Sequence, residues 1–84
     1  GGTTMALAQQ LINDGKVDEG LRFMDLEVEL TPGKIWLLRK TAQAYLSNGR
    51  PERALAMATK GLELKPADEK LLILKSEAEK GLEE

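Results

Sequence analysis

The chain of 84 residues is predicted to fold as an all-α domain, and three features of its sequence predict this class. Good helix formers such as Leu, Ala, Glu and Lys dominate the composition, and there are only 3 prolines. Apolar residues recur with a period near 3.6 along several stretches, as they do on one face of a helix. Residues of the same type also recur 34 positions apart, which is typical of a helical repeat.

A single fixed offset relates the first part of the chain to the second. The identical pairs at this offset are Ala8 and Ala42, Gln9 and Gln43, Gly15 and Gly49, Leu21 and Leu55, Glu29 and Glu63, Leu30 and Leu64, and Pro32 and Pro66. So many matches at one offset indicate two repeats, residues 3–34 and 35–68, followed by a final segment, residues 69–84. Gly1 and Gly2 fall outside the repeats and are interpreted as a remnant of cloning.

The first repeat is expected to form two helices, residues 4–13 and 17–30. Gly15 lies between them, and glycine readily takes the left-handed conformation with which many helices end. Pro32 follows the second helix, which a proline cannot continue. Gly20 inside that helix costs about 1 kcal/mol relative to alanine, so we expect close packing of a neighbouring helix to compensate.

The second repeat is expected to follow the same order, with helices at residues 35–47 and 51–64. Gly49 separates the two helices. Pro51 suits the first turn of the second helix, because its missing N–H would have no partner there. Pro66 ends the repeat.

The final segment is expected to contain a fifth helix, residues 68–82. Its inward-facing residues are expected to be Leu71, Leu72, Ala78 and Leu82. Lys75 and Glu79 would then face outward, where a further hairpin would need apolar residues. A polar outer face is what a stack of repeats requires of its last helix, so this segment is predicted to be a capping helix.

The second repeat resembles the tetratricopeptide repeat (TPR), a two-helix motif with the same period. The residues that carry the resemblance are Leu38, Ala42, Tyr45, Ala54, Gly61 and Pro66, with the turn glycine at Gly49. The first repeat is similar through Thr4, Ala8, Leu11, Gly20, Met24 and Pro32. The resemblance implies a right-handed superhelix of two helical hairpins plus the capping helix. Small residues would let the helices approach, and Tyr45 would fill the gap between hairpins.

Glu27 departs from the motif, because it stands where the repeat has a small residue. A buried carboxylate without a partner is costly. We therefore expect Glu27 to be partly exposed or paired.

The resemblance also implies a function, since most TPR arrays are scaffolds that bind a peptide or helix in a concave groove. Fold alone does not fix function, so this remains an expectation. The groove positions of the family correspond here to Met5, Gln9, Asn13, Trp36, Arg39, Lys40, Gln43, Lys70 and Ile73. The expected activity is that of a protein–protein interaction module, an adaptor or scaffold.

Trp36 is the most informative of these positions, because tryptophan is a typical binding anchor. The alternative is that Trp36 packs on neighbouring helices at the edge of the core. Arg39 and Lys40 would receive an acidic group of the partner, or else form an ordinary solvated face. Met5 and Ile73 fit the edge of the core at least as well as a binding site.

Some members of the family bind the C-terminal tail of heat-shock proteins through a five-residue clamp of Lys, Asn, Asn, Lys and Arg. The corresponding residues here are Met5, Gln9, Lys40, Lys70 and Leu74. Only Lys70 keeps its type. We therefore predict that the chain does not bind this tail.

Other classes of function are disfavoured by what the sequence lacks. The chain has neither His nor Cys, so the commonest general base, metal ligand and thiol nucleophile are missing, and neither catalysis nor a cofactor is expected. No apolar stretch approaches the roughly 20 residues that span a bilayer. The absence of cysteine weakly favours a reducing compartment such as the cytoplasm.

The charge distribution argues against nucleic acid as a ligand. Basic residues outnumber acidic ones in residues 35–68, but acidic residues outnumber basic ones on both sides, and the net charge is −2. Nucleic-acid-binding domains usually carry a strongly basic face. RNA-binding helical repeats also have a period of 35 rather than 34. The remaining alternative is a structural spacer or self-association module of a larger multi-repeat protein, with Trp36 in the contact of a homodimer.

Overall fold

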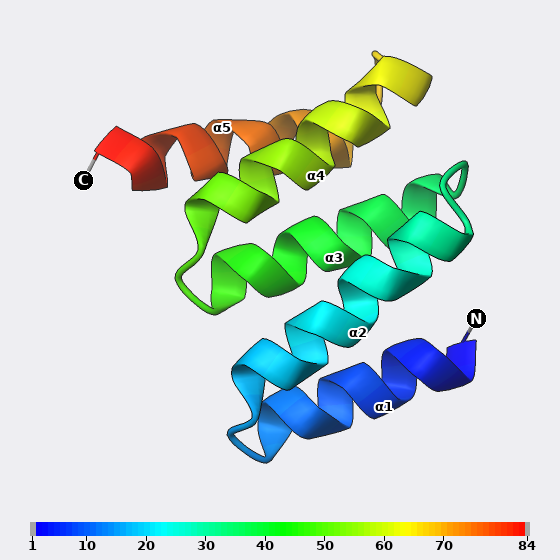
Figure 1. The fold of residues 1–84 in the computed structure, drawn as a ribbon. Coiled ribbons are helices and arrows are strands. Elements are labelled where there is room, and N and C mark those ends of the chain that lie inside the picture. The colour runs from blue at the N-terminus through cyan, green and yellow to red at the C-terminus, as the bar shows by residue number, and fades with distance from the viewer. Residues whose placement is uncertain (1, 84) are drawn as a thin grey trace. The chain divides into compact units, whose positions relative to one another are not determined.

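The computed structural model describes the backbone of residues 2–83 and the side chains of residues 4–83. These residues form five helices and no strand, which confirms the all-α class (Figure 1). The helices are α1 (Gly2–Asn13), α2 (Val17–Leu30), α3 (Ile35–Ser47), α4 (Pro51–Leu64) and α5 (Glu69–Glu83). The bounds of α2, α3 and α4 agree with the prediction. α1 begins two residues earlier than predicted, and α5 is displaced by one residue at each end.

The chain divides into two compact units between Lys34 and Ile35. In the N-terminal hairpin, α1 and α2 run antiparallel and pack on each other (Figure 1). In the C-terminal unit, α4 packs on both α3 and α5, and α3 also contacts α5.

The turns after α1 and α3 have the same backbone geometry. Gly15 and Gly49 have φ of 88° and 71°, in the left-handed region. In the first turn the Gly15 N–H donates to the Ile12 carbonyl at 3.0 Å, and the Lys16 N–H donates to the Leu11 carbonyl at 2.8 Å. The second turn has both bonds at the equivalent positions, at 3.1 and 2.9 Å. This pair of bonds satisfies carbonyls that the helix end would leave unpaired, which is why glycine is needed here.

The N-terminal hairpin has a small core that depends on a close approach of its helices. Its buried apolar residues are Met5, Ala8, Leu21, Met24 and Val28. A Cβ atom on Gly20 would lie 2.6 Å from the Ala8 carbonyl oxygen and 2.6 Å from Cγ1 of Ile12. The expected compensation for this glycine by close packing is therefore confirmed. Glu27 is half-buried, as expected for a carboxylate that stays out of the core.

The core of the C-terminal unit is aliphatic and rich in alanine. Its buried apolar residues are Leu37, Leu38, Ala42, Ala44, Tyr45, Ala54, Met57, Ala58, Leu71, Leu74 and Ala78. A Cβ atom on Gly61 would lie 2.5 Å from Cδ1 of Leu71. Gly61 therefore lets α4 approach α5. This contact joins α4 to the final helix and does not lie between α3 and α4.

The expected inner face of α5 needs correction. Leu71 and Ala78 are buried as expected, but Leu72 and Leu82 are 47% and 44% exposed, and Leu74 is fully buried. Residues 71, 74 and 78 share one side of a helix, whereas residue 72 is rotated by about 100° from residue 71. Leu82 lies in the last turn of α5.

We expect Gly20→Ala to destabilise the chain, although alanine is the better helix former by about 1 kcal/mol. The new methyl group meets a backbone carbonyl, which cannot move aside as a flexible side chain can. The net loss in free energy of unfolding should be about 1–3 kcal/mol, measured by urea titration. Gly33→Ala is the control, because no atom lies within 4 Å of its added Cβ. A Gly20→Ala variant as stable as the wild type would contradict the close approach.

Thr41 offers a second test of the core. Its side chain is completely buried, and its hydroxyl oxygen has no hydrogen-bond partner among the described residues. Valine has nearly the same shape and removes the unpaired hydroxyl, so Thr41→Val should stabilise the chain by about 1 kcal/mol. Thr59→Val, at an exposed position of α4, is the control and should change the stability by less than about 0.5 kcal/mol. Destabilisation by Thr41→Val would show that the hydroxyl is satisfied.

Candidate functional site

Asp68 is the most constrained charged residue among those described. It directly precedes α5 and is only 4% exposed. Its Oδ1 atom accepts a hydrogen bond from the Leu71 N–H at 2.9 Å, which makes Asp68 the N-cap of α5. The Arg39 Nε atom of α3 donates to both carboxylate oxygens, at 3.2 and 3.1 Å, and Nη2 also donates to Oδ2. Lys65 Nζ lies 3.8 Å from Oδ2.

These contacts keep the Asp68 carboxylate charged. The hydrogen bonds from Arg39 lower the pKa of Asp68 most, followed by the bond from the Leu71 N–H, and they outweigh burial, which acts in the opposite direction. The same interaction raises the pKa of Arg39. The pair thus joins the first half of α3 to the first turn of α5. Sequence analysis placed Asp68 inside the helix, although an aspartate before an apolar helical pattern is a typical N-cap signal.

The predicted binding residues of the C-terminal unit lie on one side of α3 and one side of α5. Trp36, Lys40 and Gln43 follow the i, i+4, i+7 spacing that shares one side of a helix. Lys70 Nζ donates to the Gln43 side-chain oxygen at 3.4 Å and so joins the two helices. Ile73 lies three residues further along α5. We call these five residues the α3–α5 face.

Exposure differs among the members of the α3–α5 face. Trp36 is 44% exposed and Ile73 is 53% exposed, so each offers apolar surface to solvent. Lys40 and Lys70 are exposed, and Gln43 is half-buried. Arg39 was predicted as part of the same site, but its guanidinium binds Asp68 within the unit. Lys40 and Lys70 are therefore the cationic residues of this face, and neither forms an ion pair among the described residues.

The three predicted residues of α1 have different surroundings. Met5 is only 2% exposed and belongs to the core of the N-terminal hairpin. Gln9 and Asn13 are exposed, and the Gln9 amide donates to the Asn13 side-chain oxygen at 2.9 Å. Gln9 and Asn13 are therefore the predicted site residues of α1 that lie at the surface. Both carry uncharged amides, which are hydrogen-bonded to each other.

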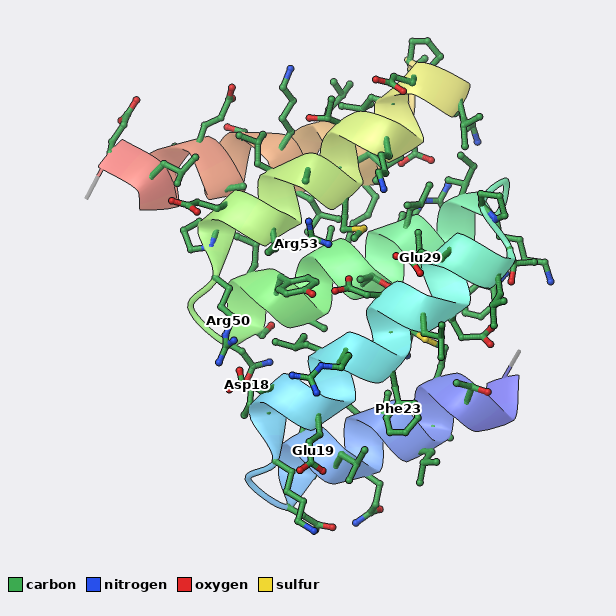
Figure 2. All side chains as sticks on the ribbon, in the orientation of Figure 1. Asp18, Glu19, Phe23, Glu29, Arg50 and Arg53 are labelled. Atoms are coloured by element: carbon green, nitrogen blue, oxygen red, sulfur yellow. The ribbon has the colours of Figure 1, made fainter. Side chains whose placement is uncertain are left out.

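Sequence analysis missed an apolar surface on α2. Phe23, Leu26 and Leu30 are 38%, 45% and 69% exposed, and we call them the α2 stripe. Figure 2 shows Phe23 and Glu29 projecting from this helix. A concavity of about 630 Å³ adjoins the stripe and is lined by Glu19, Arg22, Phe23, Asp25, Leu26 and Glu29. The i, i+3, i+7 spacing of the stripe could have revealed it, because a second such set, Leu21, Met24 and Val28, supplies the buried face.

The chain matches no protein-family model, and no curated protein matches its sequence. Within residues 2–83, no group of three or more His, Cys, Asp or Glu side chains could hold a metal ion. None of the described helices combines the length and the apolar character needed to cross a membrane.

The Asp68–Arg39 pair predicts a dependence of stability on pH. Because the pKa of Asp68 is lower in the folded chain, the unfolded chain binds the proton first as the pH falls. The stabilisation is therefore complete above the unfolded pKa of about 3.9, and it is lost as the pH falls through the folded pKa. Asn can still cap a helix. Asp68→Asn should thus be less stable than the wild type at pH 7, and the difference should shrink below about pH 4.

Urea unfolding of both proteins at neutral and acidic pH measures this difference. Glu63→Gln, at an exposed position of α4, controls for the loss of one carboxylate from the surface. A difference between wild type and Asp68→Asn that stays constant down to pH values well below about 3.9 would show that the charge of Asp68 adds nothing to stability.

Proposed function

We propose that the chain is a TPR-like scaffold that binds a peptide or helix of a partner protein on the α3–α5 face. The family assignment is supported by the two glycine turns, whose hydrogen bonds match at equivalent positions of the two repeats. It is also supported by the close helix approaches at Gly20 and Gly61, where the motif has small residues. The lack of His and Cys supports a function in binding rather than in catalysis.

The observation that carries the proposal is the exposure of Trp36. Trp36 is the one tryptophan of the chain, and 44% of the surface of this residue is exposed to solvent. Tryptophan is enriched among the few residues that supply most of the energy of a protein interface. Trp36 therefore serves as the apolar anchor, and Ile73 extends the apolar contact along α5.

The charge on the face supports a partner with acidic groups. Lys40 and Lys70 provide exposed ammonium groups beside the anchor, and lysines at the rim of an interface mainly steer and select the partner. Arg39 contributes indirectly, because its bond to Asp68 holds α3 and α5 at a fixed distance. The expected ligand is a segment with an aromatic or aliphatic residue flanked by Asp or Glu.

The proposal can be tested by selecting ligands from a phage-displayed library of random peptides. We expect the selected peptides to combine an apolar residue with carboxylates. Because Trp36 is the single tryptophan, its fluorescence reports directly on binding of a peptide without tryptophan. The Trp36→Ala variant, assayed by calorimetry, should bind such a peptide at least about tenfold more weakly.

Phe23→Ala is the matched control, because Phe23 is an exposed aromatic residue of the other unit. Its affinity for the selected peptide should equal that of the wild type. Peptides that bind Trp36→Ala as tightly as the wild type, or that leave the fluorescence of Trp36 unchanged, would place the binding surface elsewhere. Selected peptides without acidic residues would contradict the role of the lysines.

A further inference from the structure

The α2 stripe is an apolar surface whose residues lie outside the buried core of the hairpin. Its three residues lie on the side of α2 away from the buried residues Leu21, Met24 and Val28. Exposed single leucines are common, but a row of three large apolar side chains on one helix marks an interaction surface more often. Helical spacing places Arg22 and Glu29 together along one flank of this row.

Two of the charged residues beside the stripe, Arg22 and Glu29, are placed nearly symmetrically about its central residue. Arg22 lies four residues before Leu26, and Glu29 lies three residues after it. With a rise of about 1.5 Å per residue, the two charges stand about 6 and 4.5 Å from Leu26 along the helix axis, in opposite directions. Neither residue makes an ion pair among the described residues. Arg22 and Glu29, placed at nearly equal distances on either side of Leu26, are complementary to the same pair in a second copy. The concavity beside the stripe has two further carboxylates: Asp25 already has an interaction partner within the chain, and Glu19 lies seven residues before Leu26, further from the centre than the ion pairs.

We propose that α2 binds α2 of a second copy of this chain, antiparallel, about a two-fold axis that passes next to Leu26. This two-fold axis is perpendicular to both helices. Rotation about it exchanges the two helices and reverses their direction, but the flanks that carry Arg22 and Glu29 in the two copies stay on the same side of the contact. Arg22 therefore meets Glu29 of the second copy. The symmetry generates this ion pair twice. Leu26 packs on Leu26 of the second copy, and Phe23 packs beside Leu30 of the second copy. A contact that uses the same patch on both partners is the commonest arrangement in homodimers.

The charge pattern selects this occupant over others. A parallel pair of α2 helices would carry the charges of the second copy to the opposite flank, so neither ion pair could form. A strongly basic partner would be repelled by Arg22, and a strongly acidic partner would be repelled by Glu29 and Glu19. The contact is small, since each copy contributes one helix, so the dimer is of the weak and transient kind. It uses α2 only and is independent of the binding proposed for the α3–α5 face.

Sedimentation velocity of the whole chain over a range of concentrations up to about 1 mM tests the proposal. We expect a reversible monomer–dimer equilibrium. Leu26→Lys places two positive charges against each other at the axis and should weaken the dimer at least about tenfold. Leu72→Lys is the matched control, because Leu72 of α5 is 47% exposed and Leu26 is 45% exposed. The control should dimerise as the wild type does.

A charge exchange tests the antiparallel register itself. Arg22→Glu should weaken the dimer about tenfold, because it turns both ion pairs into repulsive pairs. Glu29→Arg should do the same for the same reason. The double variant Arg22→Glu/Glu29→Arg restores both pairs with reversed polarity, so its dissociation constant should return to within about threefold of the wild type. Circular dichroism verifies that each variant keeps the helix content of the wild type.

Disulfide trapping gives a direct test of the axis, because the chain has no cysteine of its own. Leu26→Cys should form a covalent dimer on mild oxidation, whereas Leu72→Cys should stay largely monomeric. A wild type that remains monomeric up to about 1 mM would overturn the proposal. So would a dimer that survives Leu26→Lys, a double charge variant that stays as weak as the single ones, or equal trapping at both cysteine positions.

Discussion

The organisation of the C-terminal unit depends on the carboxylate of Asp68. This one side chain caps α5 through the Leu71 N–H and accepts the hydrogen bonds of Arg39 from α3. A buried charge is tolerated only when it is paired and hydrogen-bonded, and Asp68 meets both conditions. Its consequence for the proposed binding site is geometric. The pair fixes α3 against the start of α5, and the residues of the α3–α5 face extend from those two helices.

Small residues set the distances at which the helices meet. Gly20 lets the backbone of α1 approach α2, and Gly61 lets Leu71 of α5 approach α4. The core needs few aromatic residues because of these approaches, which agrees with an aromatic content of 4%. Several large apolar side chains lie on the surface and not in the core. Trp36 lies on α3, and the α2 stripe lies on the N-terminal hairpin.

The two surfaces differ in the chemistry of their charges, and we propose different partners for them on this basis. Lys40 and Lys70 give the α3–α5 face one sign of charge, which favours an acidic ligand. Beside the α2 stripe, Arg22 and Glu29 lie at similar distances from Leu26 in opposite directions, which favours a second copy of the same helix. A scaffold that binds a segment on one unit and pairs weakly through the other would present two binding sites, and linked sites bind with increased avidity.

The sequence by itself determined the class and the bounds of α2, α3 and α4. These follow from glycine and proline, whose backbone preferences act locally and do not depend on the rest of the fold. Only the tertiary structure decided which side of α5 is buried and that Asp68 binds Arg39, whereas the start of α5 could have been predicted from the local N-cap signal of Asp68. Leu72 and Leu74 are both leucines, so residue type could not predict which of them is buried. The rotation of α5 against α4 decides this. Arg39 and Asp68 are far apart in sequence, and packing of α3 on α5 alone brings their charges together.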